Sequence, residues 1–258
     1  MDGARKATRS MIASDCRYAS KGRYEFISTQ KDTANGITRD IYILLDSTGK
    51  VLNTALIGNT HFFTANIGEH KAVINQSAVF FKNTERPLFI NSTGDTISCI
   101  SENMNRIVSY VLHLGKYKNL AEEDNFADIL QIGRINNNNT NKFLTIGFMA
   151  PAQRLPFIFG TSAAPINKVA GRIVYDKNSK QTYILKYDPE YKISGFNNDL
   201  DGGAPFIPIY AIGNKMYQFT DAATFIEYAN KSTSQQMKEI ASKLTEESNP
   251  VLTEITLK

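Results

Sequence analysis

The feature that most constrains this chain is a succession of short strand-like runs separated by clusters of turn residues. The runs are rich in Ile, Val, Phe, Tyr and Thr, and the clusters are rich in Asn, Asp, Ser and Gly. Residues of the first kind suit a pleated, half-buried surface, and those of the second suit tight turns. The pattern predicts an all-β fold. The expected strands are 24–29, 40–45, 51–57, 61–65, 78–81, 88–90, 96–100, 106–114, 142–149, 157–159, 172–175, 182–187, 206–212, 215–219 and 251–257.

Three of the turn clusters recur at a regular spacing. Asp46 and Asn91 begin two of them 45 residues apart, and Asp176 begins the third after a further 85. A period of about 40–50 residues with several strands in each unit is typical of β-propeller blades. We therefore expect a propeller-like fold of about four four-stranded antiparallel blades, at about 45 residues per blade.

Two helical segments interrupt the strand pattern. The first is expected at 121–132, and the second at 221–247, where Asp221 is a plausible helix cap and Met237 and Ile240 recur at helical spacing. The second should end before Asn249-Pro250, because proline disfavours helix in the residue that precedes it. It therefore forms a helical insertion before the last strand. The asparagine run 136–139 is expected to be an exposed loop. The predicted organisation is a poorly ordered basic arm over 1–22 and one propeller-like domain over 23–258.

Composition and charge exclude several classes of protein. The net charge of +4 over 258 residues is mild, so we expect no nucleic-acid partner. No apolar run approaches the ~20 residues of a membrane span, so we expect no transmembrane segment. Cys16 and Cys99 have no metal-site spacing with the three histidines, and Cys99 is expected to be a buried thiol. The basic start lacks the apolar stretch of a secretory signal, and read literally it predicts a cytoplasmic protein.

The C-terminal region carries motifs that resemble a known family. They are the segment 197–206 (NNDLDGGAPF), the helical segment after it, and the ending Asn249-Pro250-Val251-Leu252, with looser matches at 94–100 and 114–117. These motifs resemble the six-bladed β-propeller family of Bacteroides-type bacteria, over roughly residues 38–258. The resemblance implies that the chain is the C-terminal part of a six-bladed member that lacks the first blades. It also implies a family setting in the periplasm or among cell-surface lipoproteins.

The best candidate for a site is the acidic segment within 197–206. Asn197, Asp199 and Asp201, with Gly at the sixth position, match the opening of a calcium loop. The twelfth position of that template is Pro208 rather than Glu, which excludes an EF-hand. Two interpretations stay open, a looser Ca²⁺ site and a tight turn whose glycines supply positive φ. No other cofactor is expected.

The leading functional hypothesis is non-enzymatic binding, in which propeller-face loops engage a glycan, peptide or protein partner at the cell envelope. Phe157, Phe159 and Phe206 are our candidates for contacts with that ligand. The alternative is a hydrolase or lyase that acts on polysaccharide through acidic residues around Asp199 and Asp201. A third hypothesis is a non-functional gene remnant. A Ser or Cys triad has little support, because His113 is expected to be half-buried in a strand and His70 to lie in a turn.

Overall fold

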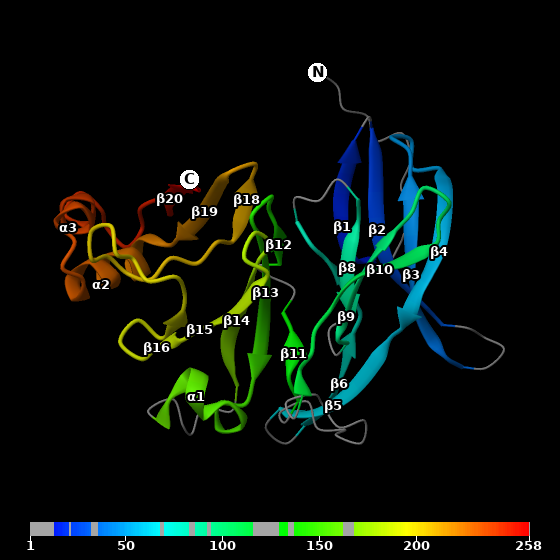
Figure 1. Ribbon diagram of the computed structural model, residues 1–258, viewed down its shortest axis with the longest axis horizontal. Helices are drawn as coiled ribbons and strands as arrows, with labels where there is room; N and C mark the ends of the chain where they lie inside the picture. The colour runs from blue at the N-terminus through cyan, green and yellow to red at the C-terminus, as the bar shows by residue number, and fades with distance from the viewer. Residues whose placement is uncertain are drawn as a thin grey trace. The chain divides into compact units, whose positions relative to one another are not determined.

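The computed structural model describes residues 13–20, 22–31, 36–67, 70–82, 86–91, 94–115, 129–133, 137–161 and 168–257. The chain divides into two compact units, residues 1–134 and 135–258. In Figure 1 the first unit is coloured from blue to green and the second from green to red. Of the predicted basic arm, residues 1–12 lie outside the described residues, whereas Ala13–Ser20 form a paired strand.

The first sheet of unit 1 is a four-stranded antiparallel meander. Its strands pair in chain order, and side chains alternate between its two faces. Ile27 lies opposite Tyr42, and both are buried in the core. The predicted turn at Asp46 is confirmed, because its carboxylate accepts hydrogen bonds from Thr48 N and Lys50 N. The strands are β1 (Ala13–Ser20), β2 (Arg23–Lys31), β3 (Thr38–Leu45) and β4 (Val51–Asn59).

The second sheet of unit 1 follows a hairpin, β5 (His61–Ile67) and β6 (His70–Gln76). The sheet is antiparallel, in the order β10-β9-β8-β7. Phe80, Phe89 and Ile100 of this sheet join Ile27 and Tyr42 in one hydrophobic cluster. Its strands are β7 (Ala78–Phe80), β8 (Leu88–Asn91), β9 (Thr96–Ile100) and β10 (Arg106–Val111). The short strand β11 (Gln131–Ile132) comes later in the chain and is not part of this sheet. Cys99 on β9 is buried, as predicted.

A buried carboxylate joins the first sheet to strand β7. Asp40 on β3 is fully buried. Its Oδ2 accepts a hydrogen bond from Ala78 N at 2.8 Å, and its Oδ1 accepts one from Thr60 Oγ1 at 2.8 Å. Asp15 on β1 acts in the same way two residues further along β7, where it accepts from Phe80 N at 2.7 Å. Hydrogen bonds to ionised acceptors are stronger than neutral ones, so these contacts position β7 firmly.

Unit 2 begins with a sheet of β12 (Asn138–Asn139), β13 (Phe143–Ala150), β14 (Val169–Asp176) and β15 (Gln181–Leu185). The short 3₁₀ helix η2 (Ala152–Arg154) and α1 (Pro156–Phe159) follow β13. The small hairpin of β16 (Tyr187–Asp188) and β17 (Ile193–Ser194) comes next. Gly171 on β14 lies opposite Phe148 on β13. A Cβ at Gly171 would lie 2.2 Å from Phe148 Cζ, so this ring occupies the space above the glycine.

The last sheet of unit 2 contains the helical insertion. Its strands are β18 (Tyr210–Ile212), β19 (Lys215–Thr220) and β20 (Val251–Thr256). Helices α2 (Ala222–Lys231) and α3 (Gln235–Ala241) lie in the chain between β19 and β20. Asp221 caps α2 by accepting a hydrogen bond from Thr224 N at 2.9 Å, as predicted. In Figure 1 both helices pack beside β20, at the end of unit 2.

The predicted all-β, propeller-like class is confirmed. In the described part of the chain, four antiparallel sheets have three or more strands, and consecutive strands pair within each of them. Propeller blades have this construction. The first two sheets belong to unit 1 and the last two to unit 2. The helical piece precedes the last strand, which completes the sheet of β18 and β19.

The asparagine run is not the exposed loop that we expected. Among its described residues, Asn137 and Asn138 are buried, and Asn138–Asn139 form β12. Asn138 Nδ2 donates to Pro208 O at 3.2 Å, and Asn137 Oδ1 accepts from Gly147 N at 3.0 Å. Backbone groups elsewhere in the chain thus supply partners for the Asn138 amide nitrogen and the Asn137 amide oxygen inside the fold.

Other local expectations are corrected as well. Residues 157–159 belong to α1 rather than to a strand, and Pro156 occupies the first helical turn, where proline is well tolerated. His113 is exposed and lies outside β10, and His70 begins β6 instead of lying in a turn. Of the helix expected at 121–132, residues 121–128 lie outside the described residues and Gln131–Ile132 form β11.

Candidate functional site

The acidic segment 197–206 is a turn that docks against the start of α3. Asn197 and Asp199 are exposed. The Asp201 carboxylate accepts hydrogen bonds from Ser234 Oγ at 2.5 Å and from Gly203 N at 3.1 Å. Ser234 is the cap residue of α3, and its oxygen accepts from Met237 N. Asp201 thus holds the residue that caps the helix.

Both glycines of the segment are needed for this docking. Gly202 has a φ of +71°, and a Cβ there would lie 2.2 Å from Thr233 Oγ1. A Cβ at Gly203 would lie 2.7 Å from Met237 Sδ. In the part of the chain that the structure describes, no group of three or more His, Cys, Asp or Glu residues is placed to hold a metal ion. The segment forms a tight turn with a positive φ at Gly202, and the looser Ca²⁺ site stays a prediction.

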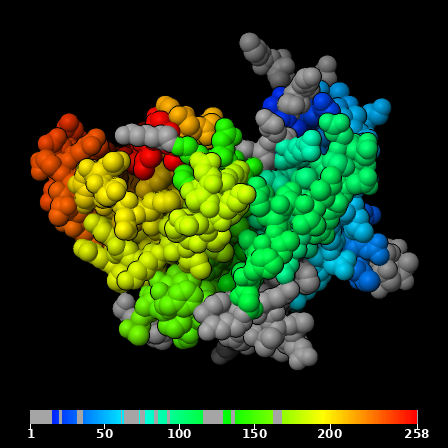
Figure 2. Space-filling model, in the orientation of Figure 1, coloured from blue at the N-terminus to red at the C-terminus, as the bar shows by residue number. Residues whose placement is uncertain are grey.

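A cavity of about 420 Å³ lies between this turn, the two helices and strand β20. All of these elements belong to unit 2. In Figure 2 the orange helical piece and the red last strand reach the surface close to the yellow segment. The apolar part of the lining includes Phe206, Phe225, Met237, Ile240, Leu252 and Ile255.

The cavity has a buried aromatic floor and an exposed aliphatic mouth. Phe206 and Phe225 are each 5% exposed. Leu200 is 81% exposed, Leu252 53% and Ile240 36%, and all three line the cavity. Large apolar side chains gathered in this way around a hollow mark a binding surface more often than isolated exposed ones do.

The charged residues of the cavity lining are acidic. Asp201 and Glu254 are the charged residues among those that the structure places along its wall. Glu254 pairs with Lys215 at 2.6 Å, and the hydrogen bond from Lys215 lowers the pKa of Glu254. Gln218 is fixed, because its Oε1 accepts from Ile207 N at 2.6 Å and its Nε2 donates to Thr220 Oγ1. A ligand therefore meets apolar groups and negative charge.

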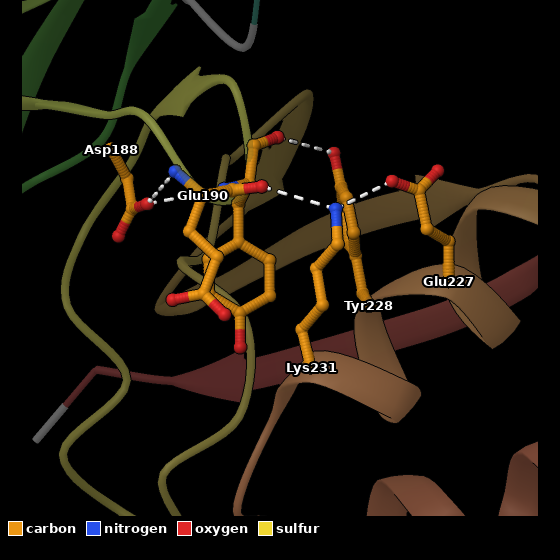
Figure 3. Close-up of polar contacts among 6 residues, drawn as sticks. Asp188, Glu190, Glu227, Tyr228 and Lys231 are labelled. Atoms are coloured by element: carbon orange, nitrogen blue, oxygen red, sulfur yellow. Dashed lines mark hydrogen bonds and ion pairs between the residues drawn. The ribbon is translucent and has the colours of Figure 1, made fainter. Parts of the chain in front are cut away.

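Helix α2 is fixed to the turn between β16 and β17 (Figure 3). Lys231 Nζ donates to Glu190 O at 3.1 Å and pairs with Glu227 at 2.5 Å. Tyr228 Oη donates to Tyr191 O at 3.3 Å, and the two rings meet edge to face. Burial raises the pKa of Tyr228, which also lines the cavity. These contacts hold one wall of the cavity in place.

The three phenylalanines that we expected to contact a ligand occupy different positions. Phe159 is 1% exposed and packs against Phe148 and Tyr187, so it is a core residue. Phe206 lines the cavity floor and also belongs to the core of the last sheet. Phe157 is exposed on α1 and is not among the residues that line the cavity.

The residues of the cavity mouth were not singled out from the sequence as binding residues. Met237 and Ile240 were noted only because they recur at helical spacing. In the structure α3 buries none of its residues, although it carries this stripe. An apolar stripe on a helix that buries nothing is the signal that could have identified this surface.

Comparisons with known proteins add no family and no relative. No family model matches the chain, and no curated protein matches it. Within the described residues, no helix is long and apolar enough to cross a membrane.

Proposed function

We propose that this protein is a non-enzymatic binding protein whose cavity in unit 2 receives an apolar side chain of a peptide partner. One observation carries the proposal, the open cavity of about 420 Å³ with Leu200, Ile240 and Leu252 exposed at its mouth. Ligand pockets commonly have volumes of about 300–1,000 Å³, with mostly apolar walls and a few placed polar groups.

The lining favours a peptide over a glycan. A sugar carries hydroxyl groups around its ring, and these would lose their water against the aliphatic mouth without gaining partners. The aromatic rings of Phe206 and Phe225 are at the floor and offer no exposed stacking platform. Asp201 and Glu254 favour a basic residue next to the inserted side chain, because complementary charges set specificity.

A titration with short peptides tests this function. The full chain is labelled with ¹³C at its methionine methyl groups, so that Met237 reports on the cavity. Acetyl-Arg-Leu-Arg-amide should shift the Met237 signal in a saturable way. Acetyl-Arg-Ser-Arg-amide and acetyl-Glu-Leu-Glu-amide should leave it unchanged, because the first lacks the apolar group and the second carries the wrong charge.

Matched variants complete the test. Ile240→Ser and Leu252→Ser should weaken binding of the Arg-Leu-Arg peptide, whereas Ile212→Ser should not. Ile212 is 57% exposed and is not part of the cavity lining, so it controls for surface hydrophobicity. Equal binding of the three peptides, or equal effects of the three substitutions, would refute the proposal.

We also propose a wider setting, in which this chain is the C-terminal part of a six-bladed propeller of the bacterial cell envelope. The motifs at 197–206 and 249–252, together with the blade-like sheets and the inserted helices, support this assignment. The test is the intact mass of the native protein in separated membrane and soluble fractions. A species clearly heavier than 28.8 kDa in the membrane fraction is expected, and a soluble species of 28.8 kDa would contradict the assignment.

A further inference from the structure

Unit 1 contains a second concave site, a cleft of about 480 Å³. One wall is a face of the first sheet, with Arg23, Glu25 and Leu44. The opposite wall comes from the segment before β8 and the turn after β9, with Arg86 and Met104. The cleft thus opens at one end of the space between the two sheets of unit 1.

Strand register explains why these side chains share one face. Arg17 on β1 lies directly opposite Glu25 on β2, and Leu44 on β3 lies opposite Glu25 on its other side. Arg23 precedes Glu25 by two positions on the same strand, and Tyr42 precedes Leu44 by two. Side chains two positions apart on a strand project to the same face.

A buried ion pair lies beside this cleft. Glu25 is 5% exposed, and Arg17 Nε approaches its Oε2 at 2.6 Å. Tyr42, 3% exposed, donates a hydrogen bond to Glu25. Burial raises the pKa of Glu25, while the nearby positive charge of Arg17 opposes that shift. A buried ion pair is a poor source of stability, because desolvation offsets the attraction.

The cationic side chains exceed the anionic ones at this cleft. Arg23 and Arg86 line it and are exposed, whereas Arg17 is engaged by Glu25. Glu102 is the other acidic residue among the described lining residues. The lining itself holds two arginines and two glutamates, and the neighbouring Arg17, which does not line the cleft but pairs with Glu25, leaves one positive charge in excess.

The cleft also has an apolar lining. It is formed by Leu44, Ile100 and Met104, which continue into the hydrophobic cluster between the two sheets. A ligand that fits both features carries an anionic group and an apolar body.

We propose that this cleft binds a small organic carboxylate, with the carboxylate between Arg23 and Arg86 and the apolar body over Leu44 and Met104. Guanidinium groups present forked donors that match a carboxylate, and such pairs are among the strongest hydrogen bonds in proteins. Glu25 holds Arg17 and attracts Arg23, so it helps to orient the cationic wall. The site is separate from the cavity of unit 2, whose charged lining residues are acidic.

Two sources supply such a carboxylate, the C-terminus of a peptide and a sugar acid. The cleft is tested by calorimetric titration of the full chain with acetyl-Gly-Leu and its C-terminal amide, and with galacturonate and its methyl ester. At least one free acid should bind saturably, and its neutral counterpart should bind at least about tenfold more weakly, the effect of losing one charged contact. The acid that binds identifies the source.

Substitutions distinguish a specific site from general attraction to a basic protein. Arg23→Gln and Arg86→Gln should each raise the dissociation constant about tenfold, and Arg→Lys at either position should have a smaller effect. Lys50→Gln removes the same charge from an exposed position of unit 1 outside the cleft and should change nothing. A thermal melt of each variant confirms folding. Failure of both acids to bind, or the same loss in all three Gln variants, would overturn the proposal.

Discussion

Replacement of Asp40 by Ala tests how unit 1 is held together. The carboxylate is fully buried and accepts hydrogen bonds from Ala78 N and Thr60 Oγ1, both at 2.8 Å. Alanine leaves these two buried donors without this acceptor. Each such loss costs about 1–3 kcal/mol, so Asp40→Ala should lower the free energy of unfolding by about 2–6 kcal/mol. That is a large share of the ~5–15 kcal/mol typical of a folded domain.

Two further variants sharpen this test. Asp40→Asn keeps one acceptor oxygen but turns an amide group toward the other donor, so it should be intermediate. Glu247→Ala removes an exposed carboxylate and should change stability by no more than about 0.5 kcal/mol. Urea unfolding can be followed by circular dichroism and by fluorescence of the 12 tyrosines, since the chain has no tryptophan. A loss below about 1 kcal/mol in Asp40→Ala, with an unchanged denaturant slope, would refute the reasoning.

Further predictions concern packing, pH and the cavity. Gly171→Ala should lower the unfolding free energy by about 1–3 kcal/mol, because its Cβ would overlap the Phe148 ring; the double variant with Phe148→Leu should recover part of the loss in urea unfolding. Burial raises the pKa of Glu25 in the folded state, so its contribution to stability is complete below the unfolded pKa and is lost as pH rises through the folded one. Glu25→Gln should therefore remove a decline in melting temperature that begins as pH rises above about 4.3, the ordinary Glu pKa, and an unchanged profile would contradict this. Ser234→Ala removes the cap of α3 and should cost about 1 kcal/mol and broaden the Met237 methyl signal; a sharp, unshifted signal would count against the docking described here.

Most strands were predictable because their signals are local. The turn at Asp46 depends on hydrogen bonds among residues 46–50, so the residues that form it are adjacent in the sequence. The strand Thr96–Ile100 was predicted with its observed bounds. Alternation and turn chemistry are properties of a few neighbouring residues, so tertiary context rarely overrides them in strongly patterned segments.

The errors arose where partners are distant in the chain. Asn138 is buried because Pro208, 70 residues away, accepts a hydrogen bond from its amide. An asparagine run otherwise has the composition of a surface loop, so the sequence pattern alone could not reveal this. Phe157 and Phe159 flank a single residue, and three apolar residues do not distinguish a strand from a helical turn.

The candidate sites were predictable only in part. The acidic segment was recognised, and Asp201 does line a cavity, but its carboxylate is engaged by Ser234. The cleft of unit 1 was not recognised, because Arg23 lies on β2, Arg86 lies in the segment before β8, and the two share no motif. Only the pairing of strands within each sheet, and the packing of the two sheets, brings them to one hollow.

The inserted helices have a consequence for how such a chain could diversify. The backbone leaves the last sheet after Thr220 and returns at Val251, the residue paired with Thr220. The insertion therefore connects two directly paired residues at the end of the β19–β20 pair, as the loop of a hairpin does. Its length and sequence can therefore change while the register of β19 and β20 stays the same. Natural variants or designed grafts could exchange this segment, and with it much of the cavity wall, without disturbing the underlying strands.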